Sequence, residues 1–215
     1  MRSRCLLLAL GACGVTSIAA AAPQVYTIEP GHTYPSFSAS HMGMTFWRGK
    51  FNKTSGKVWL DREAGTGKVD ISIDTSSVNF GLPIMDKVAQ GDTLFNVSKY
   101  PTATYKSDSV TFKNGVPVAV NGQLTLLGVT KPVPLQIESF KCMVHPFAKR
   151  EICGAVARGE LNRVEFGMTR EAEHDPMVHL TIDIEAFKGD LWTPPPGPPP
   201  GEGGVPPTGA PPGKP

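Results

Sequence analysis

The chain has 215 residues and a mass of 23.0 kDa, which favours one domain with terminal extensions over two domains. Hydrophobic residues make up 40% and charged residues 19%, so the chain can form a core and is not disordered as a whole. Its 21 basic and 19 acidic residues include Arg2 and Arg4, which lie in a segment that we expect to be removed. The mature protein is then close to neutral, which disfavours nucleic acid and anionic membrane surfaces as partners.

The first 21 residues are typical of a secretory signal peptide. A basic start is followed by an uncharged, alanine-rich run that ends in Ala19-Ala20-Ala21. Small residues at this spacing predict cleavage after Ala21 and export to the periplasm. Two alternatives are a membrane anchor and lipoprotein modification at Cys13, but the apolar run is marginal for a membrane span and too short before Cys13 for a lipoprotein signal.

The last 23 residues, 193–215, form a second appendage. They contain 11 prolines and 6 glycines and too few apolar side chains to form a core. This composition predicts a disordered, extended tail. It leaves residues 22–192 as the folded domain.

The alternation of apolar and polar residues in this domain predicts antiparallel β-strands. Residues 69–74, 133–138 and 178–185 each alternate with a period of two, and turn sequences such as Asn114-Gly115 separate such runs. A short helix or two turns are expected near 84–99, where the alternation stops. Many short strands in one domain leave a sandwich or a closed barrel. An outer-membrane barrel is less favoured, because the runs are short and the aromatic residues cluster within 37–51.

The cysteines of the mature chain form an even pair. Cys142 and Cys153 are separated by a stretch with His145-Pro146 near its centre, as expected for a hairpin loop. In an oxidising compartment such a pair predicts a disulfide. Zinc binding, with His145 as a third ligand, is the alternative, but the spacing matches no common structural zinc site.

No motif of a known catalytic or nucleotide-binding class occurs in the sequence, and the five histidines form no recognisable metal site. We therefore expect neither an enzyme nor a cofactor or metal. The large apolar residues fall around the first strands and within 80–100. They indicate either an ordinary core or a barrel whose interior holds an apolar ligand.

Several sequence blocks resemble the YceI-like family of periplasmic polyisoprenoid-binding proteins. The first is Tyr26-Thr27-Ile28-Glu29-Pro30 with Gly31-His32, Phe37 and His41, and others include Leu94-Phe95-Asn96 and Lys99-Tyr100-Pro101-Thr102. The most specific is Gly128-Val129-Thr130-Lys131-Pro132, and Leu161-Asn162-Arg163 opens a late block. The blocks occur in the family's order across residues 25–186.

This resemblance implies an all-β, lipocalin-like barrel of eight antiparallel strands without catalytic residues. It implies a long-chain isoprenoid, of polyprenyl or quinone type, or a similar amphiphilic lipid as ligand. From their size and strand positions we expect the following residues to contact it: Phe37, His41, Phe46, Phe51, Leu94, Phe95, Tyr100, Leu124, Leu126 and Ile182.

Two functions remain open at this stage. The protein is either a periplasmic carrier or scavenger of lipid, or an envelope interaction protein that uses the proline-rich tail and has no dedicated lipid. A homodimer is compatible with both, and we do not expect an integral membrane protein.

Overall fold

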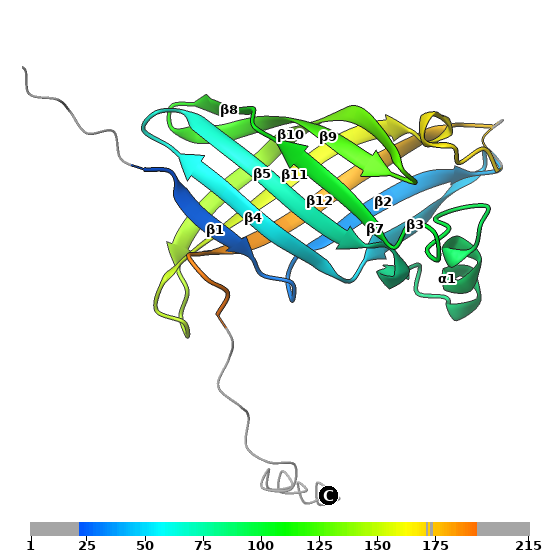
Figure 1. The fold of residues 1–215 in the computed structure, drawn as a ribbon, viewed down its shortest axis with the longest axis horizontal. Helices are drawn as coiled ribbons and strands as arrows, with labels where there is room; N and C mark the ends of the chain where they lie inside the picture. The colour runs from blue at the N-terminus through cyan, green and yellow to red at the C-terminus, as the bar shows by residue number, and fades with distance from the viewer. Residues whose placement is uncertain (1–21, 171, 173, 193–215) are drawn as a thin grey trace, which may run out of the picture.

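The computed structural model describes residues 22–192 apart from Glu171 and Glu173. The predicted signal peptide, Cys13 and the predicted tail lie outside the described residues. Nearly all the regular structure is antiparallel β, drawn in Figure 1. The strands are β1 (Gln24–Ile28), β2 (Tyr34–His41), β3 (Thr45–Phe51), β4 (Thr54–Asp61), β5 (Thr66–Asp74), β6 (Val78–Asn79), β7 (Thr102–Ser107), β8 (Val110–Lys113), β9 (Val116–Leu126), β10 (Val129–Val144), β11 (Glu151–Asn162) and β12 (Met177–Lys188). The helices are η1 (Thr75–Ser77), α1 (Pro83–Gln90) and η2 (Arg163–Phe166).

The twelve labelled strands build an eight-stranded barrel, because four of the eight are long strands broken in two. β1 and β2 lie end to end along one edge of β12. β4 and β3 lie end to end beside them, followed by β5 with β6. β7 and β8 both pair with β9. The eight-stranded antiparallel barrel predicted from the sequence is therefore confirmed.

Pairing between the first and last strands closes the barrel. Thr27 pairs with Phe187 at one end of β12, and Ile182 pairs with Pro35 farther along the same strand. Closure leaves the eight-stranded ring without the exposed edges that favour aggregation. At the break between β1 and β2, the Thr33 hydroxyl donates to the carbonyl oxygen of Glu185 at 3.2 Å and accepts from its amide nitrogen at 3.1 Å.

The alternation seen in the sequence sorts the side chains between the inside and the outside of the barrel. On β5, Val69, Ile71 and Ile73 are buried, whereas Asp70 faces outward and pairs with Lys106 at 3.2 Å. A bulge between Ile137 and Ser139 shifts the register of β10. Such an extra residue changes which side chains face inward beyond it.

The segment between β6 and β7 covers one end of the barrel (Figure 1). It contains α1, which confirms the short helix predicted near 84–99. Pro83 occupies the first turn of this helix, where no amide donor is needed. The Asp86 carboxylate accepts hydrogen bonds from the Phe80 amide at 2.6 Å and the Asn79 side chain at 3.1 Å. These contacts fix the helix against β6. No helix in the described part of the chain has the length and hydropathy to cross a membrane.

A disulfide joins Cys142 on β10 to Cys153 on β11, as the sequence predicts. The two residues are directly paired in the ladder, and the hairpin turn lies between Val144 and Glu151. This hairpin is at the end of the barrel opposite α1, close to where the described chain ends (Figure 1).

Removing this disulfide should lower stability without abolishing the fold. The bond joins cysteines 11 positions apart. A closed loop of this length is worth about 2–3 kcal/mol through the entropy of the unfolded chain. We expect the double variant Cys142→Ala/Cys153→Ala to lose that amount in guanidinium unfolding, with an unchanged circular dichroism spectrum. Equal stability of variant and parent would contradict this account.

Candidate ligand-binding cavity

The barrel encloses a cavity of about 390 Å³. This volume lies within the range of about 300–1,000 Å³ that is typical of small-molecule sites. Inward side chains of all the long strands contribute to the wall, and most of them are aliphatic or aromatic. Among the described lining residues, the charged ones are Arg163 and Arg170. The interior is therefore suited to an apolar molecule.

Small inward residues leave this space open. Ala103, Ala155 and Ala157 line the cavity, where larger side chains would fill it. Gly122 serves a different purpose, because a Cβ atom there would lie only 2.2 Å from the ring of Tyr105. The absent side chain lets the Tyr105 ring lie flat against β9. At Gly49, a Cβ atom would lie 2.6 Å from the ring of Phe37.

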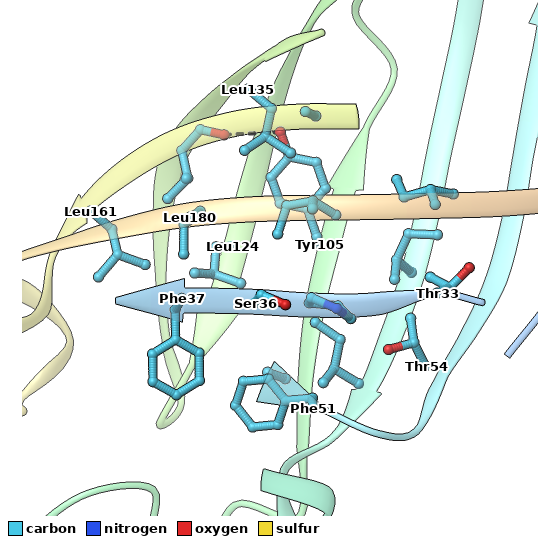
Figure 2. Close-up of a pocket in the computed structure, with 18 of the residues that line it drawn as sticks. Thr33, Ser36, Phe37, Phe51, Thr54, Tyr105, Leu124, Leu135, Leu161 and Leu180 are labelled. Carbon is cyan, nitrogen blue, oxygen red and sulfur yellow. Dashed lines mark hydrogen bonds between the residues drawn. The ribbon is translucent and has the colours of Figure 1, made fainter. Parts of the chain in front are cut away.

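A cluster of phenylalanine rings occupies the half of the barrel nearest α1. Phe37 contacts Phe51, Phe80 and Phe95 at centroid distances of 5.7, 5.6 and 6.0 Å. Phe95 comes from the segment after α1, and its ring lies 5.2 Å from that of Phe51. In Figure 2, Phe37, Phe51, Leu124, Leu180 and Tyr105 surround one space. The covering segment thus contributes directly to the cavity wall.

The cavity reaches the surface at this same end. His41, Val88 and Arg170 line it, and Val88 is 37% exposed. Arg170 comes from the loop before β12 and donates to Thr93 across the opening at 3.3 Å. At the other end, Tyr26, Leu60 and Val110 line the wall and are at most 8% exposed. The cavity is therefore a bore that opens at a mouth beside α1.

The tyrosine hydroxyls of the wall are already engaged by protein atoms. Tyr105 donates to the carbonyl oxygen of Val133 at 2.9 Å, and burial raises the pKa of its hydroxyl above the ordinary value. Tyr26 donates to Glu151 at 2.8 Å. Burial, followed by this hydrogen bond and the charge of Glu151, raises the pKa of Tyr26 to about 12. Neither group is an acid or base near neutral pH.

Two buried threonines of the wall differ in their hydrogen bonds. The Thr33 hydroxyl is paired with Glu185, whereas the Thr54 hydroxyl oxygen is buried and has no hydrogen-bond partner. Both side chains lie farther from the arrowhead of β2 than Phe37 does, which places them deeper than the phenylalanine cluster (Figure 2). An unpaired buried hydroxyl costs folding free energy.

The structure brings most of the predicted contact residues to the cavity. Eight of the ten line it: Phe37, His41, Phe51, Leu94, Phe95, Leu124, Leu126 and Ile182. Phe46 and Tyr100 do not. Phe46 pairs with Ser40 on the outer face of β3 and contacts the ring of His179 at 6.1 Å. Tyr100 packs beside Gly128 outside the bore. Whether the lining residues bind a ligand stays a prediction.

Sequence reasoning missed three kinds of lining residue. Trp47 alternates with Phe46 and therefore takes the inward position. Met85 and Val88 come from α1, for which no strand alternation exists. Thr54 lies at the break between β3 and β4, where the sequence carries no sign of an interior position. For Trp47 alone, period-two counting back from Phe51 gives the signal.

A possible metal-ligand group lies away from the cavity. Glu29, His32 and Glu185 have donor atoms within 4.8 Å of one another, and His32 is 2.7 Å from Glu29. None of them lines the bore, and the side chain of His32 is 70% exposed. No sequence pattern indicates this group, because Glu185 is far from Glu29 along the chain. The arrangement is compatible with an ordinary surface ion pair.

By its fold and its cavity, the chain is a small antiparallel barrel with an apolar interior that opens at a mouth. The profile of the YceI-like domain matches residues 26–186. Curated relatives include a UPF0312 protein of Yersinia pestis, 37% identical over 184 residues that cover 84% of this chain and 95% of the relative. A UPF0312 protein of Shewanella denitrificans is 32% identical over 170 residues, covering 78% and 88%. The chain belongs to the YceI-like family.

Solved structures share the fold at low sequence identity. A polyisoprenoid binding domain of Saccharophagus degradans, implicated in plant cell wall breakdown, is 17% identical with a TM-score of 0.56, covering 76% of this chain and 98% of its own. BcnA of Burkholderia cenocepacia is 19% identical with a TM-score of 0.58, covering 74% and 99%. The YceI protein of Campylobacter jejuni is 23% identical with a TM-score of 0.58, covering 71% and 91%.

The two buried threonines should respond in opposite directions to the same substitution. Thr54→Val removes an unpaired buried hydroxyl. It should raise the free energy of unfolding by about 1 kcal/mol. Thr33→Val breaks both hydrogen bonds to Glu185 and should lower it by about 1–3 kcal/mol. Denaturant unfolding of the two variants and the parent measures both changes. A comparable loss in both variants would show that the Thr54 hydroxyl is paired.

Alkaline pH should destabilise the barrel through its interior tyrosines. Because the folded state raises the pKa of Tyr26 from 10.0 to about 12, its contribution is complete below pH 10. Stability should fall as the pH rises from about 10 toward about 12, since the unfolded chain releases the proton first. Tyrosinate absorbance and circular dichroism, followed together, should show Tyr26 and Tyr105 ionising only as the barrel unfolds. Their ionisation in a fully folded barrel at pH 10 would overturn this expectation.

Proposed function

We propose that the protein binds a long-chain isoprenoid, of polyprenyl or quinone type, or a similar amphiphilic lipid, and acts as its carrier or scavenger. The observation that carries this proposal is the apolar bore of about 390 Å³, which opens at a mouth beside α1. Support also comes from membership of the YceI-like family and from the polyisoprenoid binding domain among the structures of the same fold. The predicted signal peptide leads us to place this activity in the periplasm.

The energetics of the bore favour a chain-like apolar ligand. Each CH₂ group moved from water into the cavity contributes about 0.8 kcal/mol. About fifteen such groups contribute roughly 12 kcal/mol, which offsets an association cost of about 4 kcal/mol and leaves the roughly 8 kcal/mol of micromolar binding. The inner wall needs no rearrangement of charged groups, because the described charged lining residues, Arg163 and Arg170, come from the mouth end.

The distribution of polar groups sets the direction of the ligand. The deep wall is formed by residues such as Leu60, Val69 and Ile71, which accommodate a hydrocarbon chain. A polar head group then remains at the mouth, near His41 and the two arginines. We expect the hydrocarbon end to enter first and the head group to stay in contact with water.

Extraction of the purified protein tests the proposal. The native protein is purified without detergent and extracted with organic solvent, and the extract is analysed by mass spectrometry. An isoprenoid or another long-chain lipid at near-stoichiometric yield supports the function. A protein that carries no lipid, and that takes none up from added polyprenol or quinone, overturns it.

Adjacent residues on β9 provide a matched pair of variants. Leu126 lines the bore and is 7% exposed, whereas Thr125 faces outward and its hydroxyl lies 2.8 Å from that of Thr130. Leu126→Arg should reduce bound lipid per folded protein at least tenfold, because an unpaired charge in an apolar cavity is costly. Thr125→Arg should leave the lipid content unchanged.

A third variant tests the bore even if Leu126→Arg fails to fold. Ala157→Phe adds apolar volume to the middle of the wall without a charge, so it should lower lipid content by occupying the bore. Lipid content is measured only on variants with the parental circular dichroism spectrum. Unchanged lipid in both cavity variants would mean that the bore is not the binding site.

A further inference from the structure

Exposed apolar side chains gather around the mouth of the bore. We call them the mouth patch: Met42, Met44 and Phe46 at the turn between β2 and β3, and Leu82, Ile84 and Val88 at α1. Met44 and Ile84 are each 71% exposed, and Met42 is 52% exposed. Contiguous exposed apolar groups on a soluble domain mark an interaction surface.

The two parts of the patch are joined by aromatic contacts. The ring of Trp47 lies 5.3 Å from that of His41 and 6.1 Å from that of Phe80. His41 ends β2, and Phe80 lies three residues before the start of α1, so these rings connect the turn to the segment that leads into the helix. Figure 1 shows the β2–β3 end and α1 at the same end of the barrel. The patch therefore borders a single opening.

The patch is continuous with the cavity wall. Val88 is both part of the patch and part of the lining, and Ile84 lies one helical turn before it on the same face of α1. His41 and Trp47, which line the bore, lie directly beside the turn that carries Met42 and Met44. A molecule leaving the bore would meet the mouth patch before it meets water.

Exposed cations flank the patch. Arg48 on β3 and Lys87 on α1 are exposed, and neither makes an ion pair with another described residue. Lys99, also exposed, lies over the ring of Tyr100 at 5.0 Å. Glu165 and Glu160 pair with Lys131 and His179, whereas the acids Asp86, Asp92 and Asp175 make no ion pair with another described residue. Arg48 and Lys87 are therefore cations beside the patch that can contact anionic groups.

We propose that the mouth patch docks onto the surface of an anionic lipid bilayer, so that the bore opens into the membrane interface. This inference rests on the proposed function, because a lipid ligand must leave and enter a membrane. Apolar side chains would enter the boundary between head groups and acyl chains, and the cations would contact anionic head groups. The near-neutral total charge is no obstacle, since salt screens charges beyond about 8 Å and only those close to the bilayer act.

The opposite end of the barrel provides a matched control. The β10–β11 hairpin exposes Phe147 at 79% and Val144 at 63%, as strongly as the mouth patch exposes its residues. Neither residue lines the bore, whereas Val88 belongs both to the mouth patch and to the cavity wall. If exposed apolar residues alone caused binding, both ends would contribute equally.

The test is co-sedimentation of the mature protein with vesicles of phosphatidylcholine, with and without phosphatidylglycerol. The double variant Met44→Glu/Ile84→Glu should bind at least about tenfold more weakly to the anionic vesicles, because it loses two apolar side chains that would be buried in the bilayer. Val144→Glu/Phe147→Glu should bind as the parent does. Arg48→Gln/Lys87→Gln should lose affinity about tenfold for anionic vesicles only. All the substituted side chains are exposed, so circular dichroism should report an intact barrel.

Four outcomes would overturn the proposal. Equal vesicle binding by the mouth and hairpin variants would remove the role of the mouth, and loss in the hairpin variant alone would move docking to the other end. A parent that is dimeric by light scattering, with a monomeric Met44→Glu/Ile84→Glu variant, would make the patch an interface between two copies.

Lipid extraction from the same samples distinguishes failure of membrane docking from failure of the proposed function. A lipid-loaded parent that does not bind vesicles contradicts docking alone.

Discussion

Each side chain of a closed sheet points either into the barrel or out to solvent. The cavity and the outer surface of this protein both depend on that constraint. Because neighbouring residues point to opposite faces, an inward register for Phe51 also fixes Trp47 inside and Phe46 outside. Closure then makes the inner face a cavity wall and the outer face a solvent surface. The small inward residues at positions such as Ala157 keep that interior from being filled. The cavity thus results from small residues at a few inward positions of the alternating strands.

The broken strands give the barrel its division into two halves. The half with β2 and β3 carries the phenylalanine cluster, the covering helix and the mouth, whereas the half with β1 and β4 carries the deep wall. The segment with α1 borders the opening through Val88 and places the ring of Phe95 against those of Phe37 and Phe51. The opening and the deep wall of the cavity are therefore formed by different halves of the barrel.

Much of the fold could be predicted because it is encoded locally. Alternation, turn residues and the cysteine pair are all short-range signals, and the barrel, the helix near 84–99 and the disulfide are confirmed. The inward positions of Phe37, Leu124 and Ile182 follow from the same alternation. Phe46 could have been excluded by the same counting, since it lies an odd number of residues from Phe51. Family resemblance was needed to choose a barrel over a sandwich.

The remaining features depend on contacts that no local pattern encodes. The unpaired hydroxyl of Thr54 follows from its place at a strand break. The group formed by Glu29, His32 and Glu185 exists only because β12 lies beside β1. Tyr100 occurs in a block that resembles the family, yet it packs outside the bore beside Gly128. Where the chain leaves the sheet, a residue that is close in sequence to large apolar residues does not necessarily point into the bore with them.

Closure between β1 and β12 also has a consequence for how the chain folds. Most ladders join strands that are neighbours in the sequence, but β1 pairs with β12. Beside this ladder, the Thr27 hydroxyl donates to the carbonyl oxygen of Gly189, 162 residues later. Contacts of such large sequence separation carry a high entropic cost of loop closure and form late. Until then the nascent sheet exposes two unpaired edges and its apolar concave face. The last strand must therefore be made before the first can be protected, so the barrel closes only after the whole domain has been synthesised.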